Sequence, residues 1–135
     1  MDTVERIGIS LEKDLLGLFD EMIKKQGYQN RSEAIRDLIR IRLSEETLKN
    51  PKAHAVAAVC LVYNHHSTSL MEKLTELQHS RLLQTVCSTH VHLDHHNCLE
   101  MIVLKGKIED INKTAENLIS IKGVKLGKIN FVPAE

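Results

Sequence analysis

Two histidines and a cysteine stand close together in residues 90–98, where their spacing predicts a metal site. Side chains of a strand alternate between its two faces, so His90 and His92 share one face of an expected strand. The polar, turn-forming run at 94–97 predicts a hairpin loop, after which Cys98 opens an apolar strand. Such a hairpin would place two imidazoles and one thiolate side by side. Nitrogen and sulfur donors of this kind bind transition metals, and a fourth histidine could complete the site.

The residues after position 50 form a pattern of six elements that would hold this hairpin. We expect a strand at 55–63, a helix at 67–85, the two hairpin strands, a helix at 109–121 and a strand at 127–132. This βαββαβ order is typical of the ferredoxin-like fold, in which both helices cover the same face of one sheet. The predicted fold class is therefore α+β, with a ferredoxin-like metal-binding domain over residues 51–135.

The two faces of that sheet are expected to be covered differently. Val91 and Leu93 alternate with the histidines, and we expect the helices to pack against the face that carries them. The strand at 55–61 is apolar on both faces, which indicates that the opposite face is buried as well. A second sheet from another subunit is the simplest cover.

His79 is the candidate for the fourth metal donor. It lies on the helix that we expect against the Val91 face, whereas the three hairpin donors point away from that face. We therefore expect His79 to reach the hairpin of a neighbouring subunit whose sheet stacks on this one. A metal bound in this way would bridge subunits, so its binding could change their arrangement.

Residues 1–50 predict a separate small domain of one strand and two helices. Residues 6–10 alternate between apolar and polar side chains, as in a short strand. Apolar residues at helical spacing lie on both sides of Gly27, which is suited to end the first helix. Asn30 and Glu33 form a capping-box-like start for the second helix.

This small domain cannot be stable alone. A lone strand has no hydrogen-bonding partner, and about 50 residues bury little apolar surface. Antiparallel pairing with the same strand of a second chain would solve both problems, so we expect an obligate dimer. Combined with the sheet contacts of the second domain, this dimer predicts a homotetramer.

The overall composition excludes several classes of protein. The 135 residues suffice for one ordinary domain or two very small ones. Lys plus Arg and Asp plus Glu are balanced at 18 each, so net charge gives no signal for nucleic acid. No apolar stretch approaches the roughly 18 residues of a membrane span, and the N-terminus lacks the apolar core of a signal peptide. Three cysteines argue against a disulfide scaffold, so we expect a cytoplasmic protein without membrane contact.

Both halves of the chain resemble known families. The segment GYQNRSEAIRD at 27–37 resembles the helix junction of ribbon-helix-helix repressors. The motifs QH at 78–79, HVH at 90–92 and HNCLE at 96–100 together resemble the NikR family of nickel-responsive regulators, over essentially the whole chain. The resemblance implies a homotetramer in which two ribbon-helix-helix dimers, made by residues 1–50, flank a core of ferredoxin-like (ACT-type) domains. It also implies a transcriptional regulator that represses nickel uptake genes when nickel is bound.

The resemblance further implies a planar nickel site, with one nickel ion per chain. Its four ligands would be His90, His92 and Cys98 of one chain and His79 of its neighbour. Glu100 matches a position that hydrogen-bonds a ligand histidine, which orients the ring.

A second cation, often potassium in this family, is implied at Glu33 and Asp37. Both carboxylates lie on one face of the second helix. For Glu33, helix capping and stabilisation of the helix dipole are a simpler account. For Asp37, the simpler account is a solvated surface position.

DNA contacts are expected from the paired strands, which fit the major groove. The family presents an arginine and then two hydroxyl residues at alternate positions, and here Arg6, Gly8 and Ser10 stand there. Glycine has no side chain to reach a base, so the middle contact departs from the pattern. Asn30 and Arg31 lie at the start of the second helix, whose backbone amides can hold a phosphate.

The donor types alone leave the metal and the function class open. Imidazole and thiolate ligands suit tetrahedral zinc as well as square-planar nickel or copper(II). A sensor of another metal, or of a small effector bound by the ACT-type domain, is the main alternative function. A zinc enzyme would need an open coordination position, which four protein ligands do not leave, so we expect no catalysis.

Overall fold

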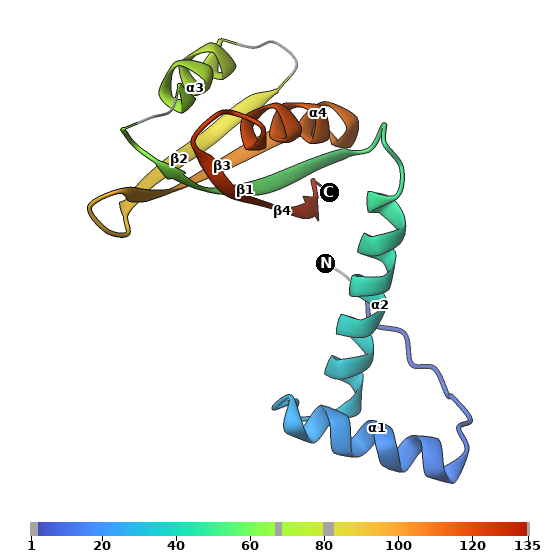
Figure 1. Cartoon of the computed structure of the whole chain (residues 1–135). Coiled ribbons are helices and arrows are strands. Elements are labelled where there is room, and N and C mark those ends of the chain that lie inside the picture. Colours follow the sequence, from blue (N-terminus) through green and yellow to red (C-terminus); the bar gives the residue numbers. More distant parts are fainter. Residues whose placement is uncertain (1–2, 67–68, 80–82, 135) are drawn as a thin grey trace. The chain divides into compact units, whose positions relative to one another are not determined.

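The computed structural model describes residues 3–66, 69–79 and 83–134 of the chain (Figure 1). Its elements are α1 (Lys13–Lys25), α2 (Arg31–Leu48), β1 (His54–Asn64), α3 (Leu70–Gln78), β2 (Gln84–His92), β3 (Asn97–Lys107), α4 (Ile108–Ile119) and β4 (Val124–Pro133). They divide into two compact units, Met1–Arg42 and Leu43–Glu135. No helix of the described residues is long and apolar enough to cross a membrane.

The first unit contains α1 and most of α2, the two helices that the sequence predicts. Gly27 adopts a left-handed φ of +85° and ends α1, where other residues would be strained. Asn30 caps α2, since its side-chain oxygen accepts a hydrogen bond from the backbone N–H of Glu33 at 2.9 Å. The strand expected at residues 6–10 is not formed by this single chain. A strand requires a hydrogen-bonded partner, and the sheet of the described residues consists of β1 to β4.

The second unit has the predicted ferredoxin-like plan. Its four strands lie in the order β2-β3-β1-β4, and each neighbouring pair is antiparallel. α3 and α4 both lie on the same face of this sheet (Figure 1). Between Thr85 and Cys87 the register of β2 against β3 shifts, which leaves Val86 as an extra residue in β2.

The helix expected at 67–85 is too long. α3 ends at Gln78, and β2 already begins at Gln84. Residues 67–68 and 80–82 lie outside the described residues. Leu83 directly precedes β2 and Val86 lies within it, so these apolar residues are not part of a helix.

The core of the second unit lies between the sheet and its two helices. Alternate residues of β1 from Ala55 to Tyr63 are buried, as are Ile102 and Leu104 of β3. From the helices, the buried side chains include Leu70, Leu74, Ile111, Ala115 and Leu118. β1 and β3 thus each turn one parity of their residues toward the helices, as expected for a sheet with one covered face.

The expectation that Val91 and Leu93 face the helices is wrong. These side chains are 43% and 52% exposed. Val91 pairs with Leu99 and lies on the other face of the sheet, which we call the open sheet face. Its apolar side chains are Val56, Ala58, Cys60, Val62, Val91, Leu99, Met101, Val103, Leu126 and Val132. The helices of this unit that pack on the sheet, α3 and α4, lie on its opposite face.

Candidate metal centre

The β2–β3 hairpin brings three potential metal donors together. In its register His92 is opposite Cys98 and His90 is opposite Glu100, so all four side chains share one face of the sheet. One ligand atom from each of His90, His92 and Cys98 lies within 4.8 Å of the others. Two nitrogens and one sulfur at this spacing can close on a transition metal with small side-chain movements.

Cys98 is at the centre of this cluster. Its side chain is fully buried, and its Sγ lies 3.5 Å from Nδ1 of His92. A fully buried sulfur beside two imidazoles fits a metal ligand, since cysteine binds metals as its thiolate. The donors present therefore suit a soft or borderline cation such as nickel, copper or zinc.

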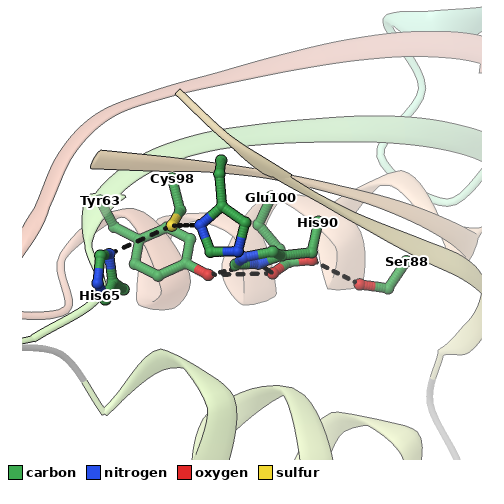
Figure 2. A network of polar contacts seen from close by, with 7 residues as sticks. Tyr63, His65, Ser88, His90, Cys98 and Glu100 are labelled. Atoms are coloured by element: carbon green, nitrogen blue, oxygen red, sulfur yellow. Dashed lines mark hydrogen bonds and ion pairs between the residues drawn. The ribbon is translucent and has the colours of Figure 1, made fainter. Parts of the chain in front are cut away.

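The donors lie on the helix-covered face of the sheet, at its hairpin end. Cys98 and Glu100 continue the buried alternation of β3 through Ile102 and Leu104. The hairpin donors were expected on the face opposite the helices, and this expectation is wrong. The sheet faces therefore do not require that His79 come from another chain. α3 lies near the cluster in Figure 2, on the same side of the sheet.

Glu100 is a buried carboxylate with three hydrogen-bonding partners (Figure 2). It is 2% exposed; the hydroxyls of Tyr63 and Ser88 donate to it at 3.2 and 3.0 Å. Nδ1 of His90 lies 3.0 Å from the same carboxylate. Burial, and then the charge of Glu100, raise the pKa of Tyr63, so its hydroxyl remains a donor. The carboxylate thus fixes the ring of His90 and leaves Nε2 for a metal.

The hairpin loop is held by Asp94. Its carboxylate accepts hydrogen bonds from the backbone N–H groups of His96 and Asn97, both at 2.8 Å, and from the amide side chain of Asn97 at 2.9 Å. These bonds, led by that of the Asn97 side chain, lower the pKa of Asp94 to about 2. The turn therefore keeps β2 and β3 in the register that unites the donors.

His79 lies outside the cluster of its own chain. It is the residue directly after α3, where its backbone caps the helix, and its side chain is exposed. Among the described residues, the group close enough to hold a metal contains His90, His92 and Cys98 alone. A planar four-ligand site therefore needs a donor from elsewhere.

His65 lies closer to the cluster than the sequence indicated. It follows β1 directly, and its Nδ1 is 3.4 Å from Sγ of Cys98. Loss of solvent, and then repulsion by His66 and His92, lower the pKa of His65, which favours the neutral ring. The signal in the sequence was strand parity, since His65 and Tyr63 are two residues apart at the end of β1.

The predicted DNA-contact residues all lie in the first unit. Arg6, Gly8 and Ser10 are exposed and belong to no strand of this chain. Arg31 forms a two-pronged ion pair with Asp20 of α1, with both N–O distances at 2.8 Å. The hydrogen bond from Arg31 lowers the pKa of Asp20. Arg31 thus ties the start of α2 to α1.

The predicted second-cation residues, Glu33 and Asp37, lie one turn apart on α2. The backbone N–H of Glu33 donates to the side-chain oxygen of Asn30, as described above. Asp37 accepts a hydrogen bond from the hydroxyl of Tyr28 at 2.7 Å and forms an exposed pair with Arg40 at 3.4 Å. The Asp37 hydrogen bond raises the pKa of Tyr28.

Comparisons with known proteins assign both units. Residues 56–132 match the family described as the NikR C terminal nickel binding domain, and residues 5–49 match the ribbon-helix-helix protein, copG family. A protein of Trichlorobacter lovleyi is 50% identical over 134 residues, which cover 99% of this chain and 96% of the relative. A protein of Lawsonia intracellularis is 43% identical over 135 residues, 100% of this chain and 97% of the relative. Both relatives carry the name "Putative nickel-responsive regulator". The chain therefore belongs to the NikR family of nickel-responsive transcriptional regulators, with a ribbon-helix-helix segment ahead of a NikR-type C-terminal domain.

Proposed function

We propose that this protein binds one nickel ion per chain and that nickel controls its binding to double-stranded DNA, with repression of nickel uptake genes as the result. One observation carries the proposal: His90, His92 and the buried Cys98 converge beside a carboxylate that orients a ligand ring. Bound nickel would supply a centre that demands a fixed set of donors, and so would favour one arrangement of the chains. The protein then acts as a sensor in the cytoplasm and catalyses no reaction.

The fourth nickel ligand is proposed to be His79 of a neighbouring chain. Support comes from its exposed side chain and from its place outside the cluster of its own chain. If ligation crosses subunits, a mixture of His79→Ala protein with His90→Ala/His92→Ala protein should regain some complete sites. Failure of mixed oligomers to recover any planar nickel spectrum would remove His79 as a bridging ligand.

A homotetramer is the proposed assembly, with the functional division of the chain after residue 50. The open sheet face carries apolar side chains from all four strands, and a second sheet is a suitable cover for it. In the first unit Ile7 and Ile9 are 76% and 58% exposed. Pairing of this segment with the same segment of another chain would reduce their exposure. Two kinds of contact, one per domain, give a dimer of dimers.

DNA recognition is proposed for the paired N-terminal strands. Arg6 can donate two hydrogen bonds to a guanine in the major groove, and Ser10 can make a shorter contact. Gly8 offers only its backbone, so we expect less discrimination at the middle base. Asn30 and Arg31, at the start of α2, are proposed to lie against phosphates, with Arg31 held in place by Asp20.

Glu33 and Asp37 are proposed to help bind a second cation such as potassium. Their spacing of one helical turn supports this, because carboxylate oxygens on one helix face can share a hard cation. The competing pair of Asp37 with Arg40 is long and exposed, so it is weak.

A DNA-binding titration with and without nickel tests the proposal as a whole. The probe is the promoter DNA upstream of the protein's own gene and of nickel transport genes. Nickel should raise affinity several-fold to hundred-fold, the range of an allosteric coupling of about 1–3 kcal/mol. Arg6→Ala should lose operator selectivity while it retains nickel affinity. Equal DNA affinity in both conditions would exclude the sensor role.

A further inference from the structure

The two carboxylate oxygens of Glu100 have different partners (Figure 2). Oε1 is shared, since it lies 3.0 Å from Nδ1 of His90 and 3.2 Å from the hydroxyl of Tyr63. Oε2 accepts a hydrogen bond from the hydroxyl of Ser88 at 3.0 Å, and in the described part of the chain this is its one partner. Ser88 therefore holds the oxygen that the other two side chains do not contact.

A carboxylate that is held at one oxygen can still turn about its terminal bond. This torsion of a glutamate side chain has a broad energy minimum, so it is not fixed by the chain itself. Rotation of the Glu100 carboxylate would carry Oε1 away from Nδ1 of His90 and would leave a buried oxygen unsatisfied. A hydrogen bond at the second oxygen stops this rotation, so Glu100 presents Oε1 to the ring in one direction.

The register of the hairpin brings Ser88 within reach of Glu100. Ser88 and His90 are two residues apart in β2 and share one face of the sheet, where they are opposite Ile102 and Glu100 of β3. Ser88 thus contacts Glu100 along the diagonal between two paired strands. β2 supplies both a metal donor and the hydroxyl that fixes the hydrogen-bond acceptor of that donor. The backbone pairing of β2 with β3 holds all three side chains in place without a metal.

We propose that Ser88 is a positioning residue of the nickel site and acts through Glu100 on the ring of His90. This inference rests on the proposed role of the hairpin donors as nickel ligands. A carboxylate only accepts hydrogen bonds, so the Nδ1–H of His90 faces Glu100 and Nε2 keeps its lone pair for a metal. Because Ser88 fixes the carboxylate, the ring is oriented before nickel arrives, and less side-chain freedom is lost on binding.

The neighbouring residue Thr89 shows what an ordinary polar position of this strand looks like. Both Ser88 and Thr89 are exposed residues of β2, which is an edge strand of the sheet. Thr89 is opposite Met101 on the open sheet face, and its hydroxyl has no hydrogen bond within the described residues. The hydroxyl of Ser88 is instead bonded to a carboxylate that is 2% exposed. Thr89 is therefore a matched control for Ser88.

The test compares Ser88→Ala, Ser88→Thr and Thr89→Ala in the full-length protein, with nickel as the probe. Ser88→Ala should lower nickel affinity about 10-fold, as expected for a group that orients a metal ligand, whereas Ser88→Thr keeps the hydroxyl and should bind as wild type. Thr89→Ala should also bind as wild type. In the metal-free protein, the NMR signal of the His90 ring N–H should be lost through exchange with water in Ser88→Ala alone. In a Glu100→Met background, Ser88→Ala should cause no further loss of nickel affinity, because the side chain through which it acts is absent.

Equal nickel affinity of Ser88→Ala and Thr89→Ala would overturn the inference. A loss as large in the Glu100→Met background as in wild type would overturn it too, because Ser88 would then not act through Glu100. An unchanged His90 ring signal in metal-free Ser88→Ala would have the same consequence. Failure of the proposed function is distinct, since the wild-type protein would then bind no nickel while the His90 signal would still respond to Ser88→Ala.

Discussion

The two units of the chain differ in how far one copy completes them. In the first unit only Ile23 and Ala34 are buried among the described apolar residues, while Leu15, Leu18, Leu38 and Ile39 are about half exposed or more. The second unit has a continuous core on one face of its sheet and three metal donors in contact. A single chain therefore brings three metal donors together, whereas the first unit leaves most of its apolar side chains exposed and, in our proposal, is completed by a second chain.

The largest expected effect comes from preventing the proposed pairing of the N-terminal strands of two chains. Ile7→Asp should place a charge where the paired strands cover the helices, at a cost of several kcal/mol. We expect loss of DNA binding and of part of the helical circular dichroism, with nickel affinity unchanged. Thr3→Asp adds the same charge ahead of the strand and should behave as wild type. Normal DNA binding by Ile7→Asp would mean that these strands do not pair.

The next largest effect is expected from removal of the Cys98 sulfur from the metal centre of the second unit. Cys98→Ser should reduce nickel affinity by more than about 100-fold, above the range for an outer hydrogen-bond partner, and remove the thiolate charge-transfer band. Thermal unfolding of the metal-free protein should change little, because serine nearly preserves the volume of the buried side chain. Cys87→Ser, on an exposed position of β2, is the control and should keep the band.

A smaller effect is expected from the hydroxyl that holds Glu100. Tyr63→Phe removes one donor of a buried carboxylate and should lower nickel affinity about 10-fold. It should also destabilise the fold by about 1–3 kcal/mol in chemical denaturation. Tyr28→Phe removes a similar bond to Asp37 in the first unit and should leave nickel affinity unchanged. Equal nickel affinity in both variants would show that Tyr63 does not help to position Glu100.

The smallest effect concerns the hairpin turn and depends on pH. The folded protein lowers the pKa of Asp94 from 3.8 to about 2, so its carboxylate stabilises the fold above pH 4. That contribution is lost as the pH falls from about 4 through 2. Asp94→Ala should be less stable than wild type at neutral pH, and the difference should shrink over this window in denaturation curves. A difference that does not vary with pH would exclude ionised Asp94 as the turn's support.

The elements of the second unit could be predicted from the sequence, but the covered face of its sheet could not. Periodicity and glycine positions located the helices and strands because these depend on local residues. From Cys98 to Leu104 both parities of β3 are largely apolar, and Glu100 made the truly buried parity look exposed. Its burial depends on Tyr63 and Ser88, which lie far away in the sequence.

The metal donors of the hairpin could be foreseen because they lie within a few residues of one another. His90, His92 and Cys98 needed only strand alternation and one tight turn. The contact of His65 with Cys98 required the register of β1 against β3, which joins residues 33 apart in the chain. The pattern of neighbouring residues in the sequence does not predict contacts that depend on how two distant strands are paired.

The extra residue Val86 has a consequence for the histidines that follow it. Before it, Thr85 is opposite Leu104 and turns toward the helices; after it, Ser88, His90 and His92 do the same. Side chains of an uninterrupted strand alternate strictly, so Thr85 and these even-numbered residues would otherwise lie on opposite faces of the sheet. The bulge adds one residue to the alternation of β2. Thr85 before the bulge and the two histidines after it therefore all point toward the helices. Deletion of Val86 would turn either Thr85 or the two histidines to the open sheet face.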